Sequence, residues 1–287
     1  MSSAKLVEYL PAEPVAQPSS PPRANILGVG VHAIDLPQAA DVIESAIVGG
    51  RKGYVCVTGV HGVMEAQRSE EFRTILSRAL LVTPDGMPTV WVGRLQGHTH
   101  MRRVFGPDLM LEVCRRSIAA GHTHFLYGGK PGVAEHLRAV LTERFPAIEI
   151  VGTYTPPFRD LSRAEEINLM RQVSLSEPDI IWVGLSTPRQ ERFMSNYLHR
   201  LNSKLMIGVG AAFDIHTGKI KDAPSWMKKS GLQWLHRLYQ EPSRLWKRYL
   251  INNCGFVGKL ALQLFRLKNY ELEQALEYAT ELLDVNR

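Results

Sequence analysis

A single carboxylate stands where an apolar segment of the sequence ends. In "RALLVTPDGMPTVW", residues 78–91, an apolar run leads into a turn that holds Asp85 between Pro84 and Gly86. Pro-Asp-Gly is ordinary turn chemistry, so these residue types alone do not require a function. Open α/β sheets, however, bind their ligands at the carboxyl ends of their strands. Asp85 is therefore either a turn residue or a carboxylate that faces a ligand.

Two further segments carry polar residues or glycines just after apolar runs. In "VGLSTPRQERFM" (183–194), Thr187 and Gln190 would point into the same crevice, or they cap the helix that follows. In "YGGKPGVAEH" (127–136), Gly128 and Gly129 precede the start of a helix. Backbone amides at such a start can hold a phosphate or a ribose, although turn geometry explains the glycines equally well.

Cations recur at helical spacing near the end of the chain. In "LHRLYQEPSRLWKRYL" (235–250), Arg237, Arg244, Lys247 and Arg248 would form one stripe on a continuous helix. Pro242 is expected to start a new helix within this segment. A stripe of guanidinium groups suits a diphosphate or a phospholipid, while a solvated helix face is the simpler alternative.

Several common motifs are missing or incomplete. "GVGVHA" and "GVGAAF" lack the third glycine of a dinucleotide fingerprint, and no P-loop, HExxH or GxSxG motif occurs. No DxD pair exists, and the two His-x-His pairs have no third ligand nearby. The three cysteines are far apart, which is typical of a reducing, cytosolic compartment. We therefore predict no metal site and no cofactor.

The candidate residues need a scaffold, and the pattern of the chain supplies one. From residue 25, where the first β-rich run "NILGVGVHAI" begins, such runs alternate with segments of helical period as far as residue 218. This alternation predicts a Rossmann-like α/β domain over 25–218, with a mainly parallel sheet and helices on both faces. Residues 1–24, rich in Pro, Ser and Ala, are predicted to be a disordered tail without the apolar core of a signal peptide.

Charge is distributed unevenly along the chain. The 287 residues carry a net charge of +6, but residues 219–268 hold eleven Lys or Arg and two acids, so the rest is net negative. The same segment is rich in Trp and Tyr. This composition suits a helix at a membrane interface, and equally a helical hairpin that packs its aromatics on the main domain. We predict a helical appendage over 219–287, and no apolar run approaches the ~18 residues of a membrane span.

Taken together and in this order, the motifs resemble the WecG/TagA/CpsF family of glycosyltransferases, which make bacterial surface polymers. The matching stretches are "VTPDGMPTVWVGRLQG", "RVFGPDLM", "FLYGGKPGVAEHL", "IIWVGLSTPRQERFM" and the long segment from "IGVGAAFDIHTGKIKDAPSWMKKSG" to "RLWKRYL". They cover roughly Ile26 to Leu250. Each stretch is weak alone, and the ordered set is specific.

The resemblance implies an inverting, metal-free transfer of a sugar from a UDP-sugar to a polyprenyl-diphosphate-linked sugar. It implies that Asp85 is the general base and that Arg237 is a catalytic cation of an appendage that closes the site. It implies that Arg103, Asp108, Gln190, Arg244 and Lys247 bind substrate, with Thr58 and His61 at a further contact position. Thr187, Gly128 and Gly129, which the residue patterns above place at a ligand crevice or a helix start, complete the predicted substrate-binding set. One departure concerns the donor: the family often has Thr-x-Asn after its second strand, whereas Thr58 is followed here by Gly59, Val60 and His61. N-acetylmannosamine, glucose and a uronate are all candidate sugars.

The resemblance also implies a location and partners. The expected place is the cytoplasmic, inner face of the plasma membrane, where a peripheral enzyme would meet a lipid-linked acceptor. No nucleic-acid partner is expected, because the α/β body is acidic, and a homo-oligomer is an open alternative. Two other functions compete with this interpretation: a nicotinamide-dependent oxidoreductase with a degenerate Rossmann motif, and a nucleic-acid-binding protein that uses the basic segment.

Overall fold

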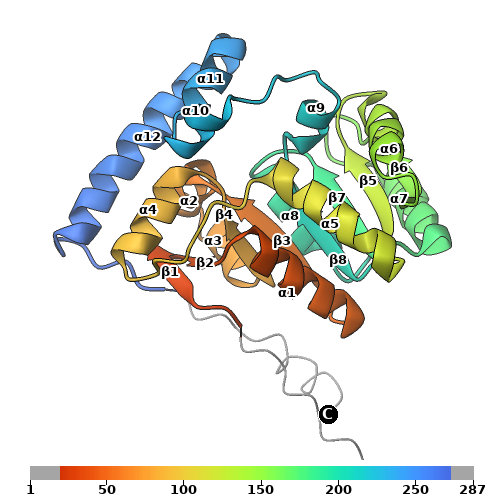
Figure 1. Cartoon of the computed structure of the whole chain (residues 1–287), viewed down its shortest axis with the longest axis horizontal. Coiled ribbons are helices and arrows are strands. Elements are labelled where there is room, and N and C mark those ends of the chain that lie inside the picture. Colours follow the sequence, from red (N-terminus) through yellow and green to blue (C-terminus); the bar gives the residue numbers. More distant parts are fainter. Residues whose placement is uncertain (1–19, 273–287) are drawn as a thin grey trace, which may run out of the picture.

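A computed structural model describes residues 20–272 of the chain. Residues 1–19 and 273–287 lie outside the described part, and with them most of the predicted disordered tail and the end of the predicted appendage. The described residues form one sheet flanked by helices, a small hairpin and a group of C-terminal helices (Figure 1).

Six parallel strands form the central sheet, in the spatial order β4-β3-β8-β7-β5-β6. Their bounds are β3 Gly53–Thr58, β4 Leu81–Pro84, β5 Thr123–Gly128, β6 Glu149–Tyr154, β7 Ile180–Gly184 and β8 Leu205–Gly208. All residues of β3 and β8 are buried, as expected for strands covered on both faces. The prediction of an α/β fold with a mainly parallel sheet is confirmed.

Helices cover both faces of the sheet. One face carries α1 (Leu36–Val48), α5 (Gly106–Ala120) and α6 (Val133–Arg144), with the short α9 (Ala212–His216) beside them. The other carries α2 (Val60–Ala66), α3 (Glu70–Ser77), α7 (Arg163–Ser176) and α8 (Arg189–Tyr197). Side chains alternate across the sheet, so Trp182 of β7 packs in the first layer and Val183 in the second.

The first β-rich run does not join the main sheet. It folds into an antiparallel hairpin of β1 (Arg23–Ile26) and β2 (Val29–His32), which forms a two-stranded sheet of its own. Gly28 makes the tight turn, with φ at +83°. Because Arg23 and Ala24 already belong to β1, the ordered domain begins before the predicted boundary at residue 25.

Within the described residues, three helices follow the α/β body: α10 (Ser225–Lys229), α11 (Gln233–Gln240) and α12 (Pro242–Leu264). The long α12 packs against α2, and its Phe256 joins the hydrophobic core. Its far end is held by the hairpin, because the backbone N–H of Leu27 donates to Gln263 Oε1 at 3.1 Å. None of the helices within residues 20–272 is both long and apolar enough to cross a membrane.

Candidate active site

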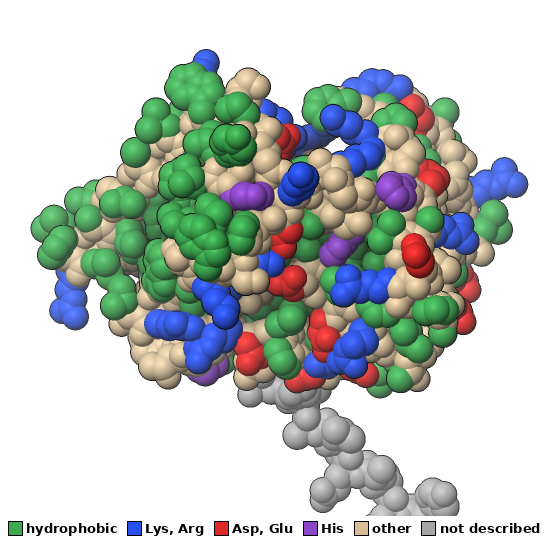
Figure 2. All heavy atoms as spheres, turned by 45° about the horizontal axis from the view of Figure 1, so that its top comes forward, with side chains coloured by type: hydrophobic (Ala, Val, Ile, Leu, Met, Phe, Trp, Pro, Cys, Tyr) green, Lys and Arg blue, Asp and Glu red, His purple; other side chains and the backbone are tan. Residues whose placement is uncertain are grey.

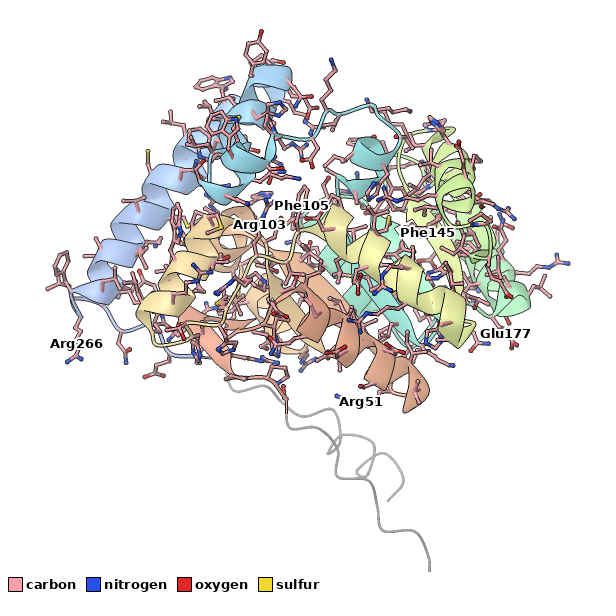
Figure 3. The ribbon with its side chains drawn as sticks, in the orientation of Figure 1. Arg51, Arg103, Phe105, Phe145, Glu177 and Arg266 are labelled. Atoms are coloured by element: carbon pink, nitrogen blue, oxygen red, sulfur yellow. The ribbon has the colours of Figure 1, made fainter. Side chains whose placement is uncertain are left out.

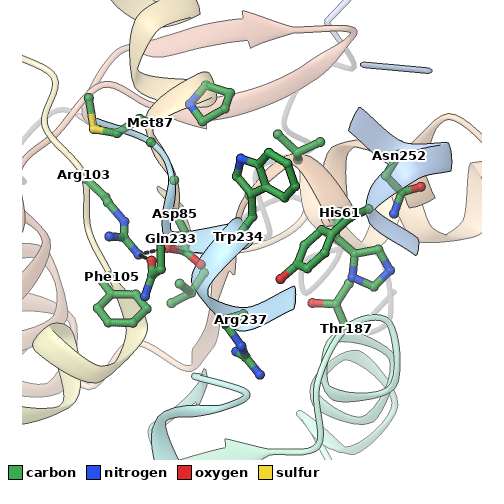
Figure 4. A pocket seen from close by; sticks show the side chains of 18 of the residues that line it. His61, Asp85, Met87, Arg103, Phe105, Thr187, Gln233, Trp234, Arg237 and Asn252 are labelled. Atoms are coloured by element: carbon green, nitrogen blue, oxygen red, sulfur yellow. Dashed lines mark hydrogen bonds and ion pairs between the residues drawn. The ribbon is translucent and has the colours of Figure 1, made fainter. Parts of the chain in front are cut away.

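The carboxyl ends of four neighbouring strands open into one cavity of about 720 Å³. Residues that follow β3, β4, β7 and β8 line it on the sheet side, and α4 (Met87–Leu95), α11 and α12 line it on the other sides. Figure 4 shows side chains from these elements converging on the cavity. The C-terminal helices therefore cover the edge at which a parallel open sheet binds its ligands.

Asp85 lies in the wall of this cavity, directly after β4. The parallel register pairs Thr58 with Pro84, and the backbone N–H of Asp85 donates to Thr58 O at 3.0 Å. The next residue, Gly86, has φ at +103°, and α4 begins immediately after it. The side chain of Asp85 keeps 32% of its surface exposed, at the cavity.

Gly59 permits the close approach of these two strand ends. A Cβ on Gly59 would lie 2.4 Å from the backbone oxygen of Asp85. We expect Gly59→Ala to lower the free energy of unfolding by about 1–3 kcal/mol, because overpacking displaces the Asp85 loop. Gly258→Ala in α12 is the matched control: nothing lies within 4 Å of its Cβ, and Ala favours a helix interior by roughly 0.5–1 kcal/mol. Urea denaturation measures the free energy of unfolding of both variants. If Gly59→Ala proved as stable as Gly258→Ala, the steric role of Gly59 would be contradicted.

Arg103 lies on the segment that connects α4 to α5 (Figure 3), and it pairs with Asp85. Its Nη2 donates to Asp85 Oδ1 at 3.2 Å and also to Gln233 Oε1 of α11. The guanidinium lies over the ring of Phe105, 4.1 Å from its centroid. Arg103 thereby links Asp85, the candidate base, to α11.

Burial raises the pKa of the Asp85 carboxyl above its ordinary value. The charge of Arg103, its hydrogen bond and the charge of Arg237 oppose this effect, while the charge of Asp108 adds to it. Asp108 itself is exposed in the first turn of α5 and does not line the cavity. A carboxylate with a raised pKa is a stronger base, which is the property a proton acceptor needs.

Arginines of α11 and α12 line the same cavity. Arg237 and Arg244 share Glu241, with their Nη2 atoms 3.3 Å and 2.8 Å from its Oε2. The Nε atoms of Arg237 and Arg248 are buried without a hydrogen-bond partner. Buried donors without partners are costly, so this wall is suited to an anionic ligand that accepts their hydrogen bonds.

Lys247, in contrast, does not line the cavity. It is exposed, and its Nζ lies over the ring of Trp246, 5.4 Å from the centroid. Helix α11 ends at Gln240 and α12 begins at Pro242, so Arg237 lies on a different helix from Arg244 and Lys247. The predicted single stripe on one continuous helix does not form. On α12, Arg248, four positions after Arg244, lines the cavity with it, whereas Lys247, three positions after Arg244, does not.

His61 lines the cavity from the first turn of α2. The Nε2 of His61 is 3.6 Å from Glu65 Oε1, and burial together with the charges of Arg248 and Arg68 lowers its pKa to about 4. The imidazole is therefore neutral at pH 7. Thr58 is buried under Gly62 and is not part of the cavity wall.

Gln190 lines the cavity and carries a buried acceptor atom without a hydrogen-bond partner. Its side chain is only 2% exposed, its Nε2 donates to Glu191 Oε1 at 3.0 Å, and its Oε1 has no partner. Thr187 Oγ1 donates to the same Glu191 oxygen at 2.8 Å. Glu191, which is 1% exposed, thus holds the side chains of Thr187 and Gln190 in place. Because the amide nitrogen of Gln190 donates to Glu191, its amide oxygen is left to accept a hydrogen bond.

The comparison with known protein families decides what kind of protein carries this cavity. Residues 24–270 match the "Glycosyl transferase WecG/TagA/CpsF family". The chain belongs to this family. It is 31% identical over 217 residues to the N-acetylglucosaminyldiphosphoundecaprenol N-acetyl-beta-D-mannosaminyltransferase of Bacillus subtilis (strain 168), covering 75% of this chain and 82% of that protein. The protein of the same name from Bacillus spizizenii (strain ATCC 23059 / NRRL B-14472 / W23) is 30% identical over 213 residues, 72% of this chain and 79% of that protein.

Membership of the WecG/TagA/CpsF family makes the protein a glycosyltransferase and replaces the oxidoreductase alternative. Two glycines that were predicted to contact substrate because they precede a helix start lie outside the cavity wall. Gly128, with φ at +134°, packs on the backbone of Gly184, and Gly129, with φ at +78°, lies under Val133. Close packing and turn geometry account for both positions.

Some lining residues of this glycosyltransferase were not among the sequence candidates. They are Gln233 and Trp234 on α11, Asn252 on α12, Trp91 on α4 and Lys228 on α10. Gln233 lies four positions before Arg237, and Asn252 lies four positions after Arg248, so helical spacing is the signal that could have found these two residues. Within residues 20–272, no group of three or more His, Cys, Asp or Glu side chains could hold a metal ion.

Proposed function

We propose that the protein is an inverting glycosyltransferase that moves a sugar from a UDP-sugar to a polyprenyl-diphosphate-linked sugar without a metal ion. The observation that carries this proposal is the cavity that Asp85 lines together with the arginines of α11 and α12. Asp85 is the only carboxylate among the described residues that line it, whereas five lining residues are Lys or Arg: Arg103, Lys228, Arg237, Arg244 and Arg248.

The chemistry requires a proton acceptor and a counter-charge. The acceptor hydroxyl oxygen forms a bond to the anomeric carbon, the bond from that carbon to the UDP oxygen breaks, and the hydroxyl proton passes to Asp85. UDP leaves with the electron pair of the broken bond. The cations of α11 and α12 stabilise the negative charge that develops on its diphosphate, the role that a metal ion fills in other transferases.

The relatives support the class of acceptor. Both are named as transferases that act on N-acetylglucosaminyldiphosphoundecaprenol, a sugar joined to a polyprenyl diphosphate. We infer an acceptor of that class for this protein. The donor sugar is N-acetylmannosamine, glucose or a uronate. Val60 stands where the family often has Asn, and the next residue, His61, also lines the cavity and is a candidate for selecting among these sugars.

Release of UDP across a panel of UDP-sugars tests this function. The assay uses a synthetic lipid-diphosphate-linked N-acetylglucosamine as the acceptor, and each donor is also measured without it. We expect one donor class to release UDP only when the acceptor is present. Turnover of NADH, or UDP release that ignores the acceptor, would contradict the proposal.

A lipid-linked acceptor requires contact with a membrane surface, and we propose that α10–α12 provide it. Large aromatic side chains are exposed on or near these helices: Trp226, Tyr239, Trp246 and Phe265. Figure 2 shows hydrophobic side chains gathered on the side where α4 and α12 lie, with Lys and Arg among them. Aromatic and basic residues together favour the interface of an anionic bilayer.

The double substitution of Tyr239 and Trp246 by Ser tests this contact. We expect affinity for vesicles containing anionic lipid to fall about tenfold or more, since each apolar side chain removed from water contributes roughly 1.5–3 kcal/mol when fully buried. Leu175→Ser, at an exposed position on α7, is the control that keeps wild-type binding. Sedimentation with vesicles measures the membrane affinity of the wild-type protein, the double variant and Leu175→Ser. If the double variant bound vesicles as tightly as the wild type, Tyr239 and Trp246 would not be part of the membrane contact.

A further inference from the structure

The cavity has an apolar arm in addition to its charged end. The arm runs between α4 and α12, and its walls are Trp91, Val92 and Leu95 on one side and Phe256, Val257 and Leu260 on the other. None of these six side chains can form a strong hydrogen bond to a sugar or a phosphate, apart from the indole N–H of Trp91. The arm therefore has no chemistry for the polar part of either substrate.

The arm is open to the surface although it is apolar. Leu95 is 71% exposed and Val257 is 65% exposed, and Trp91 is exposed as well. Phe256 and Val92 form its buried floor. Exposed apolar side chains that face one another across a groove favour an apolar occupant.

The arm is continuous with the charged end. Gly231, in the turn between α10 and α11, packs on Trp91 so closely that a Cβ there would lie 2.8 Å from Trp91 Cη2. The same turn leads into α11, which carries Gln233 and Arg237 at the charged end. A single ligand can thus extend from the arginines, past Trp91, into the apolar arm.

We propose that this arm holds the first isoprenoid units of the acceptor lipid while its diphosphate lies at the cationic end of the cavity, where the five lining Lys and Arg side chains face this diphosphate as well as that of UDP. The inference rests on the proposed function and assigns the acceptor's chain to this part of the protein. Charge complementarity selects this occupant, because an anionic headgroup joined to an apolar chain matches a cationic end joined to an apolar arm. A UDP-sugar has no apolar chain, so the arm belongs to the acceptor. The chain nearest the diphosphate is therefore bound by protein and leaves the bilayer.

Two water-soluble acceptors with the same diphosphate-linked sugar test the proposal. One carries a short isoprenoid chain and the other only a methyl group, and transfer is measured without vesicles or detergent. We expect KM for the isoprenoid acceptor to be at least about tenfold lower, since burying each methylene group is worth roughly a fourfold gain in affinity. The double substitution Leu95→Gln and Val257→Gln should raise that KM and bring the two acceptors close together.

Ile251→Gln is the matched control, because Ile251 is exposed on α12 but does not line the cavity. It should keep the wild-type preference for the isoprenoid acceptor. Equal KM values for both acceptors in the wild-type protein would overturn the assignment of the arm as a lipid site. An unchanged preference for the isoprenoid acceptor in the double variant would do the same. Either result would leave the proposed function standing. If neither acceptor receives a sugar from any donor, the proposed function itself fails and the inference falls with it.

Discussion

Asp85→Asn is expected to lower kcat for sugar transfer by about a hundredfold to ten-thousandfold, the usual contribution of a positioned general base. Asn has nearly the same shape but cannot accept the proton of the attacking hydroxyl. Substrate binding should change much less, so the loss is expected in kcat rather than in KM. The measurement is initial-rate kinetics with both substrates varied, on protein whose fold has been checked by circular dichroism.

The substitution also removes one partner of an ion pair, which calls for a control of stability. Arg103 would keep its bond to Gln233 but lose the carboxylate of Asp85. A cost of about 1–3 kcal/mol in unfolding free energy is expected, so assays belong well below the melting temperature. Asp160→Asn, in the exposed loop after β6, is the matched variant and should behave as wild type. Near-normal kcat in Asp85→Asn would remove this residue from the mechanism.

The pH dependence of the wild-type enzyme follows from the same carboxyl. Burial raises the pKa of Asp85, and the group acts as a base only when it is ionised. The value of kcat/KM should therefore fall as the pH drops through this raised pKa, at a higher pH than an ordinary aspartate would give. The acidic limb should be missing from the residual activity of Asp85→Asn.

Arg237→Gln is expected to lower kcat/KM by about a hundredfold to a thousandfold, comparable to removing one oriented group that stabilises charge in a transition state. Arg237 lines the cavity, its Nε has no partner, and its charge acts on Asp85. Without it, the departing diphosphate keeps more of its negative charge uncompensated. A product-inhibition assay with UDP should show weaker binding in the variant.

Lys247→Gln tests whether the reaction depends on the position of Arg237 or on the general positive charge of residues 235–250. The family resemblance assigns Lys247 to the substrate, whereas the structure turns it toward Trp246 and away from the cavity. We therefore expect Lys247→Gln to change kcat/KM by less than about threefold with a water-soluble acceptor, as for an exposed charge. Equal losses in Lys247→Gln and Arg237→Gln would show that general positive charge, and not the position of Arg237, supports the reaction.

Much of the fold could be predicted because its strands are short, apolar and regularly spaced. β3 and β8 are buried over their whole length, and such strands indicate a sheet covered on both faces. The position of Asp85 followed from the rule that ligands lie at the carboxyl ends of parallel strands. The hairpin of β1 and β2 did not follow, because an apolar run with glycines reads in the same way whether it joins the main sheet or turns back on itself at Gly28.

The remaining site residues depend on packing that the sequence does not encode locally. The choice between Lys247 and Arg248 depends on the break between α11 and α12 at Glu241, which changes the face that each residue presents. Thr58 keeps the family position but is covered by Gly62, so its burial becomes visible only once α2 is in place. Glu191 reads as a surface residue of an amphipathic helix, and only the structure reveals that it is buried against Thr187 and Gln190.

The most direct test of the central claim is a transfer reaction run in EDTA and followed to its product. Purified protein, the productive UDP-sugar and a lipid-diphosphate-linked N-acetylglucosamine are combined, and NMR reads the new linkage while UDP is quantified. The account predicts one UDP for each sugar transferred, an inverted anomeric configuration and a rate that EDTA does not lower. Transfer with retained configuration, or transfer that requires an added divalent ion, would contradict the roles given to Asp85 and to the arginines of α11 and α12.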